Sequence, residues 1–307
     1  MKVLITGVAG GIAQKLAMEL VTRGHQVVGI DVRPWRESPS AIEMHRTDLR
    51  KRAAEEVFRK TRPQAVVHMA TVSQLVASSN ERSRINLGGT QAVFDHCKSY
   101  GVEHCIFVGR HTYYGAAADT PLYHTETEPP QALGEYPELA DLVAADLFAG
   151  SQLWQIPQLV TSVLRFCYTL GPIGQGTLAT YLKGRAVPMV MGFDPLFQFL
   201  HEDDVIGALI LALEKRPRGI FNVAGPMPLP LSTLAAECKR PVLPMPEFLL
   251  KAMLGRAGLP NLPIGALNHI KFPVVVDGTS FQKTCGFQHQ FDELQTVQTF
   301  AQAYPPR

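Results

Sequence analysis

The sequence predicts an α/β fold in which helices cover both faces of a doubly wound parallel sheet. In the first half of the chain, short apolar runs alternate with segments whose apolar residues recur at helical spacing. A glycine-rich turn joins the first of these runs directly to the first helix. After about residue 166 the alternation weakens and prolines accumulate, which predicts a smaller, irregular C-terminal lobe.

The expected elements follow one another at short intervals. The strands are short runs rich in branched residues, whereas the helices place apolar side chains three or four residues apart. Strands are expected at 3–5, 25–31, 65–68, 104–108 and 160–165, with returning strands at 197–200 and 220–223. Helices are expected at 12–23, 53–61, 80–100, 137–154 and 203–215, and shorter ones at 231–239 and 247–256. We therefore expect one domain from 1–168, to which 195–223 return, and a lobe made of 169–194 and 224–307.

Composition argues against several classes of function. The chain has 307 residues and a net charge of +2, which gives no electrostatic reason to expect a nucleic-acid partner. The longest strongly apolar stretch, 205–213, is far shorter than the ~20 residues that span a bilayer. The sequence begins without the long apolar region of a signal peptide, and its five cysteines form no C-x-x-C pair. We therefore expect a cytoplasmic protein with reduced thiols, no membrane partner and no metal.

The turn after the first strand has the pattern G-x-x-G-x-x-A. Gly7 would form the tight turn, Gly10 would let the backbone approach a pyrophosphate, and Ala13 would let the helix pack closely on the strand. The amino end of the following helix offers free N–H groups and a positive dipole end to phosphates. This arrangement predicts dinucleotide binding.

A carboxylate at the end of the second strand indicates which dinucleotide binds. Asp31 lies 24 residues after Gly7, where it can accept hydrogen bonds from the hydroxyls of the adenosine ribose, as in NAD sites. Arg33 and Arg36 lie just beyond the strand, where an arginine can pair with the 2′-phosphate of NADP. We expect NAD, with NADP as the less favoured alternative.

Eight motifs occur in order along nearly the whole chain: TGVAGGIA, TDLRK, VVHMAT, INLGGT, FVGRHTYYG, LRFCYTLGP, FLHEDDVIGALILAL and VVDGTSFQKTCGF. Together they resemble the extended short-chain dehydrogenase/reductase superfamily, in its NAD-dependent epimerase/dehydratase group. The resemblance implies a Rossmann-type domain, a substrate-binding lobe and hydride transfer to a bound nicotinamide. It also implies cofactor contacts from Gly7, Ala9, Gly10, Gly11, Ile12, Asp31, Arg33, Asp48, Leu49, Met69, Ala70, Thr71 and Asn86.

The resemblance further implies a catalytic group of tyrosine, lysine and serine or threonine. Tyr136 stands at the entrance of a helix, where the family has its tyrosine. The residue four positions later, where the family has lysine, is Ala140, and Arg110 occupies the serine position. Thr112 is the nearest hydroxyl, and His111 is an adjacent group that could move a proton. The candidate catalytic residues are therefore Tyr136, Arg110, His111 and Thr112.

Three functions remain open. In the first, the chain is an epimerase/dehydratase-like oxidoreductase that acts on a nucleotide sugar or a related hydroxyl substrate. Its site would be non-standard, because Arg110 would supply the positive charge that the family takes from lysine. In the second, the chain binds NAD without turnover, as a sensor or assembly subunit. In the third, it is a dehydrogenase of a small or lipid-like secondary alcohol, since the 226–307 lobe is rich in apolar residues.

The helix at 137–154 predicts a homodimer. It is apolar on nearly all sides, so it needs to be buried on more faces than one sheet can cover. The resemblance implies that this helix and the preceding long one pair with their copies across an interface between subunits.

Overall fold

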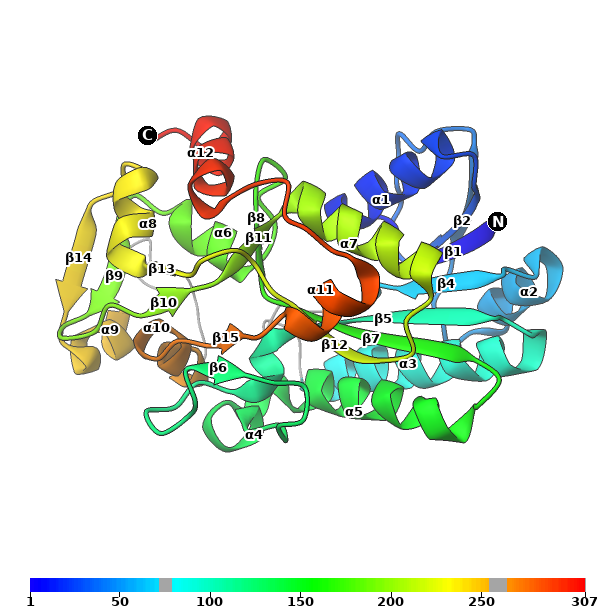
Figure 1. Ribbon diagram of the computed structural model, residues 1–307, viewed down its shortest axis with the longest axis horizontal. Helices are drawn as coiled ribbons and strands as arrows, with labels where there is room; N and C mark the ends of the chain where they lie inside the picture. Colours follow the sequence, from blue (N-terminus) through cyan, green and yellow to red (C-terminus); the bar gives the residue numbers. More distant parts are fainter. Residues whose placement is uncertain (72–78, 254–263, 307) are drawn as a thin grey trace. The chain divides into compact units, whose positions relative to one another are not determined.

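The structure is a computed structural model that describes residues 1–71, 79–253 and 264–306 (Figure 1). The chain forms two compact units. The first unit contains Met1–Gly109, Asp141–Arg165 and Ile206–Phe221, and the second contains Arg110–Ala140, Phe166–Val205 and Asn222–Arg307. The domain limits expected from the sequence divide the chain differently at 110–140 and 195–205, and they stay a prediction.

Within the described residues, seven strands form one large sheet in the order β12-β7-β5-β4-β1-β2-β3. Their bounds are β1 Lys2–Thr6, β2 Gln26–Asp31, β3 Ile42–Arg46, β4 Ala65–His68, β5 His104–Arg110, β7 Val160–Phe166 and β12 Gly219–Val223. β1 pairs in parallel with both β2 and β4, β2 pairs in parallel with β3, and β4 with β5. The predicted α/β class with a doubly wound parallel sheet is confirmed.

One edge strand, β3, was not among the expected elements. It reads IEMHR, and Ile42 is its one fully buried residue. Because β3 lies at the edge of the sheet and has β2 as its single neighbour, most of its side chains need no apolar character. A search for apolar runs therefore misses it.

Helices cover both faces of this sheet, as Figure 1 shows. α3 (Ser79–Tyr100) and α5 (Ala140–Gln155) lie together on one face, where the Phe94 and Phe148 rings meet edge to face with their centroids 6.0 Å apart. α1 (Gly11–Thr22) and α7 (Glu202–Lys215) lie on the other face, and α2 is Arg52–Thr61. The amino end of α1 follows the carboxyl end of β1 directly, which is the edge of a parallel sheet where ligands bind.

The second unit is built from short elements around its own core, in keeping with the expected irregular lobe. Its helical segments are η1 His111–Tyr114, α4 Ala132–Glu135, η2 Pro137–Leu139, α6 Thr177–Leu182, α8 Leu231–Glu237, α9 Glu247–Met253, η3 Ile264–Leu267, α10 Asn268–Lys271, α11 Thr279–Cys285 and α12 Glu293–Ala303. Its strands are β6 Tyr123–His124, β8 Tyr168–Leu170, β9 Val187–Val190, β10 Leu196–Phe197, β11 Phe199–His201, β13 Leu229–Pro230, β14 Val242–Met245 and β15 Val275–Val276. The core gathers buried side chains such as Leu182, Phe199, Leu234 and Phe300.

Two expectations for this unit are corrected by the strand pairing and by the backbone. The strand expected at 197–200 is split into β10 and β11, which pair with β13 and β8 and not with the large sheet. The helix expected at 231–239 ends at Glu237, because the next residues turn through Lys239, which has a positive φ of 53°. The part of the helix expected after residue 253 lies outside the described residues. None of the described helices is both long enough and apolar enough to cross a membrane.

Candidate functional site

The glycine turn between β1 and α1 is shaped by a close backbone contact. Gly7 has a φ of 73°, and its N–H donates to the carbonyl oxygen of Ile30 at 2.8 Å. A Cβ atom at this position would lie 2.8 Å from the backbone of Ala70, two residues after the neighbouring strand β4. Gly10 is the N-cap of α1 and, having no side chain, it makes no capping hydrogen bond to that helix. The positive end of the helix dipole, which lies at this turn, favours an anion.

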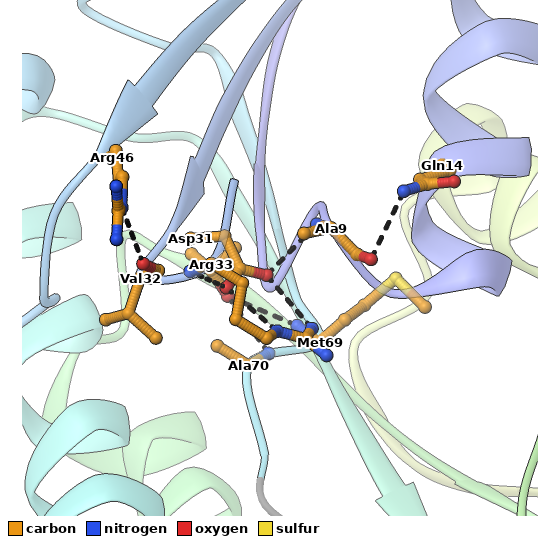
Figure 2. Close-up of polar contacts among 9 residues, drawn as sticks. Ala9, Gln14, Asp31, Val32, Arg33, Arg46, Met69 and Ala70 are labelled. Atoms are coloured by element: carbon orange, nitrogen blue, oxygen red, sulfur yellow. Dashed lines mark hydrogen bonds and ion pairs between the residues drawn. The ribbon is translucent and has the colours of Figure 1, made fainter. Parts of the chain in front are cut away.

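The Asp31 carboxylate lies beside this turn and holds it (Figure 2). Asp31 is 6% exposed, and it accepts hydrogen bonds from the backbone N–H of Ala9 at 3.0 Å and of Arg33 at 2.8 Å. The exposed Arg33 side chain folds back onto the same carboxylate, with Nη2 and Oδ2 3.2 Å apart. A carboxylate and a guanidinium therefore stand together at the edge of the sheet, next to the anion-binding end of α1.

A buried network beneath the turn involves residues that the sequence analysis missed. The Thr90 hydroxyl donates to a carbonyl of its own helix, so its oxygen accepts a hydrogen bond from His68 Nε2 at 3.0 Å. His68 Nδ1 then accepts from the Thr6 hydroxyl at 2.6 Å, and the Thr6 oxygen accepts the N–H groups of Met69 and Ala70. Burial lowers the pKa of His68 to about 4, which keeps the ring neutral. The one signal in the sequence is a histidine that ends an otherwise apolar strand.

The other expected cofactor residues divide into two groups. Gly11 and Ile12 form the first turn of α1, and Met69, Ala70 and Thr71 follow β4 at the same edge of the sheet. Asp48 is instead bound by Arg50, whose hydrogen bonds lower the pKa of Asp48 to about 2, and Leu49 is part of the apolar core. Asn86 is fully buried in α3, where its side-chain amide donates to Asp141 beside the Arg82–Asp141 ion pair.

The expected catalytic residues all lie in the second unit. Arg110 ends β5 and is half-buried, and no carboxylate in the described part of the chain pairs with it. His111 and Thr112 begin the short helix η1, and Tyr136 is the buried N-cap of η2. Ala140, at the family's lysine position, is exposed at the start of α5.

Two further aromatic residues join this group. The His111 ring meets the Tyr168 ring edge to face with centroids 4.3 Å apart, and the Tyr136 ring meets His269 in the same way at 5.7 Å. Burial, together with the influence of Tyr136, raises the pKa of Tyr168. Burial also lowers the pKa of His111 to about 3 and that of His269 to about 4. Tyr168 lies within the LRFCYTLGP motif but received no role there, and none of the eight motifs contains His269. The contacts of both residues depend on how distant segments pack.

The described residues contain no group of three His, Cys, Asp or Glu side chains arranged to hold a metal ion. They do contain a glycine turn of the kind that binds nucleotides in one unit, and a group made of the half-buried Arg110 with buried histidine and tyrosine side chains in the other. The sequence of residues 3–224 matches the NAD-dependent epimerase/dehydratase family. The chain belongs to this family.

The relatives of this epimerase/dehydratase chain are diverse. An uncharacterised protein of Mycobacterium tuberculosis is 27% identical over 267 residues, which cover 84% of this chain and 69% of the relative. A 3-diazoavenalumate denitrifying reductase of a Streptomyces species is 27% identical over 275 residues, which cover 83% of this chain and 86% of the relative. The solved UDP-glucose 4-epimerase of Thermus thermophilus, in complex with NAD, superposes with a TM-score of 0.79 at 22% identity over 99% of each chain. That last likeness concerns the fold.

Proposed function

We propose that the chain binds NAD at the glycine turn and acts as an NAD-dependent, epimerase/dehydratase-like oxidoreductase on a hydroxyl-bearing substrate. One observation carries the cofactor part of this proposal. The buried Asp31 carboxylate is held at the turn by the Ala9 N–H, at the end of β2, where an adenosine ribose would present its hydroxyls. Solved proteins of the same fold were crystallised with NAD, which supports the same cofactor here.

The described residues suit each part of this cofactor. The first turn of α1 would bind the pyrophosphate, since the positive end of the helix dipole lies there and Gly10 lets the backbone approach closely. Asp31 would bind the ribose, after Arg33 has turned away from it into solvent. The bound nicotinamide would supply a hydride acceptor. Thr6 and His68 position the Met69–Ala70 backbone against Gly7, so they keep the floor of the turn in place.

On the substrate side, we propose that Arg110, His111, Thr112 and Tyr136 do the work of the family's serine, tyrosine and lysine. The His111 Nδ1 donates to the carbonyl oxygen of Phe166 at 3.1 Å, so in the neutral ring the lone pair lies on Nε2. Nε2 can therefore accept a hydrogen bond from a substrate hydroxyl. Arg110 supplies a permanent positive charge that Ala140 cannot.

Calorimetric titration with NAD and NADP tests the cofactor proposal. We expect the wild-type protein to bind NAD more tightly than NADP, because the Asp31 charge repels a 2′-phosphate. Asp31→Asn keeps an acceptor for the Ala9 N–H and should reduce the preference by about tenfold. Arg33→Gln serves as the control, since it leaves the carboxylate in place and should not reverse the preference. A wild-type protein that prefers NADP would show that Arg33, and not Asp31, determines which of the two cofactors binds more tightly.

Two classes of compound are candidates for the substrate. A nucleotide sugar is supported by the UDP-glucose 4-epimerases of the same fold. A different reducible or oxidisable compound is supported by the Streptomyces reductase and by the replacement of the lysine position by Ala140. Incubation with UDP-glucose and NAD separates them, and we expect no fast 4-epimerisation. We also propose that the chain works as a homodimer in the cytoplasm.

A further inference from the structure

A group of polar atoms in the second unit is buried without hydrogen-bond partners. His111 is 2% exposed and uses its Nδ1 on the Phe166 carbonyl, but Nε2 has no partner among the described residues. In the same unit, neither ring nitrogen of His269 has a partner among the residues that the structure describes, although both are buried. The two histidine rings contact Tyr168 and Tyr136, respectively, edge to face. Three orphaned nitrogens therefore gather in one aromatic group.

Such an arrangement is costly unless another molecule completes it. Each buried polar atom left without a partner destabilises the fold, because its hydrogen bonds to water are lost and not replaced. Native proteins pair nearly all of these atoms with protein groups, ordered water or a ligand. The structure of this group therefore indicates a position for polar atoms of a ligand.

Arg110 adds an unmatched positive charge to the same group. It immediately precedes His111 at the end of β5, and no carboxylate in the described ranges forms an ion pair with it. Burial lowers the pKa of Arg110, but a guanidinium stays charged at neutral pH. Its charge is among the influences that keep the neighbouring His111 neutral, together with burial and His269. A single carboxylate on a ligand would supply the counter-ion for this one positive charge.

We propose that Arg110, His111 and His269 form a subsite for a hydroxycarboxylate group of the substrate. Arg110 binds the carboxylate with its planar N–H groups. The substrate hydroxyl donates to the lone pair of His111 Nε2, and an N–H of His269 donates to a remaining oxygen. A carboxylate alone would place negative charge against the His111 lone pair, which is why a hydroxyl is part of the ligand. This inference deepens the proposed function, on which it rests, by naming the substrate class.

The test uses the full-length protein with isotope-labelled histidine, followed by NMR. Signals of the His111 and His269 rings are assigned from the His111→Gln and His269→Gln variants. The probes are lactate and 3-hydroxybutyrate, with lactamide as the uncharged match. We expect both ring signals to shift saturably with at least one hydroxy acid, with a dissociation constant of about 1–10 mM, and not with lactamide. UDP-glucuronic acid compared with UDP-glucose then shows whether the acid is free or carried on a nucleotide sugar.

Two matched arginine variants show whether the hydroxy acid binds at Arg110 itself or is attracted by the positive charge of the protein in general. Arg110→Gln should weaken the binding of the hydroxy acid about tenfold or more, whereas Arg185→Gln, which removes an exposed arginine of the same unit, should not change it. The proposal is overturned if no hydroxy acid shifts either ring up to about 50 mM, or if Arg110→Gln responds as the wild type does. NAD titration of the wild-type protein and of the same variants reports on the first unit. A wild-type protein that binds the hydroxy acid but not NAD would refute the proposed cofactor and leave this subsite standing.

Discussion

Two glycines with the same backbone conformation have different surroundings. Gly7 and Gly24 have φ values of 73° and 80°, a region that other residues adopt at a cost of about 1–2 kcal/mol. A Cβ at Gly7 would press against the Ala70 backbone at 2.8 Å, whereas a Cβ at Gly24, just after α1, would meet nothing within 4 Å. The difference between the two positions is therefore steric and not conformational.

We predict that Gly7→Ala lowers NAD affinity about tenfold or more and destabilises the fold by about 2–4 kcal/mol, because strain and clash add. Gly24→Ala carries the strain alone, so it should cost about 1–2 kcal/mol and leave NAD affinity unchanged. Urea unfolding and calorimetric titration measure both quantities. Wild-type NAD affinity in Gly7→Ala would show that the turn does not approach the cofactor.

At the scale of elements, α5 buries one face and exposes large apolar side chains on another. Ala145 and Ala149 are fully buried in the core of the first unit. Leu147 is 47% exposed and Trp154 is 74% exposed on the same helix. An exposed Trp near the end of an apolar helix is typical of a surface that another subunit covers.

We predict that the protein is a homodimer at micromolar concentration and that α5 contributes to its interface. Leu147→Glu together with Trp154→Glu should yield a monomer, because a carboxylate buried at an interface is left unpaired. Phe248→Glu changes a residue of similar exposure on α9 and should leave the mass unchanged. Light scattering after size-exclusion chromatography gives the mass. A monomeric wild-type protein would contradict the prediction.

At the scale of the whole molecule, both units bury neutral imidazoles. Burial lowers the pKa of His68 and His104 in the first unit, and of His269 in the second, to about 4. The unfolded chain binds a proton at each of these residues below its ordinary pKa of ~6.5, whereas the folded chain does not until about pH 4. Their contribution to stability is therefore complete above pH ~6.5 and is lost as the pH falls toward 4.

We predict that the free energy of unfolding, measured in urea, falls steadily between pH ~6.5 and ~4. Each buried imidazole contributes up to about 3 kcal/mol to this fall, from the difference between its two pKa values. His68→Gln should make the fall smaller by about that amount. His45→Gln, which removes a partly exposed imidazole on β3, should change the fall less. Equal stability at both ends of the range would mean that these rings are protonated in the folded protein.

Features that depend on neighbouring residues could be predicted from the sequence alone. Strands and helices of the sheet region could be predicted because their apolar residues repeat with periods of about 2 and 3.6. The Gly7 turn and Asp31 could be predicted because a positive φ and a carboxylate at a strand end are local requirements. These signals indicated the fold class and placed the expected nucleotide turn.

Which distant side chains meet was visible only in the folded chain. His269 lies far along the chain from Tyr136, yet their rings are in contact. The Asn86 side chain donates a hydrogen bond to Asp141, which belongs to another helix. β10 and β11 pair with strands outside the large sheet, and β3 forms an edge strand of that sheet although its sequence has no apolar run. Such contacts depend on the packing of segments that are separated in sequence, and no local period or turn records them. The unpaired charge of Arg110 could likewise be seen only once every nearby described carboxylate had been placed.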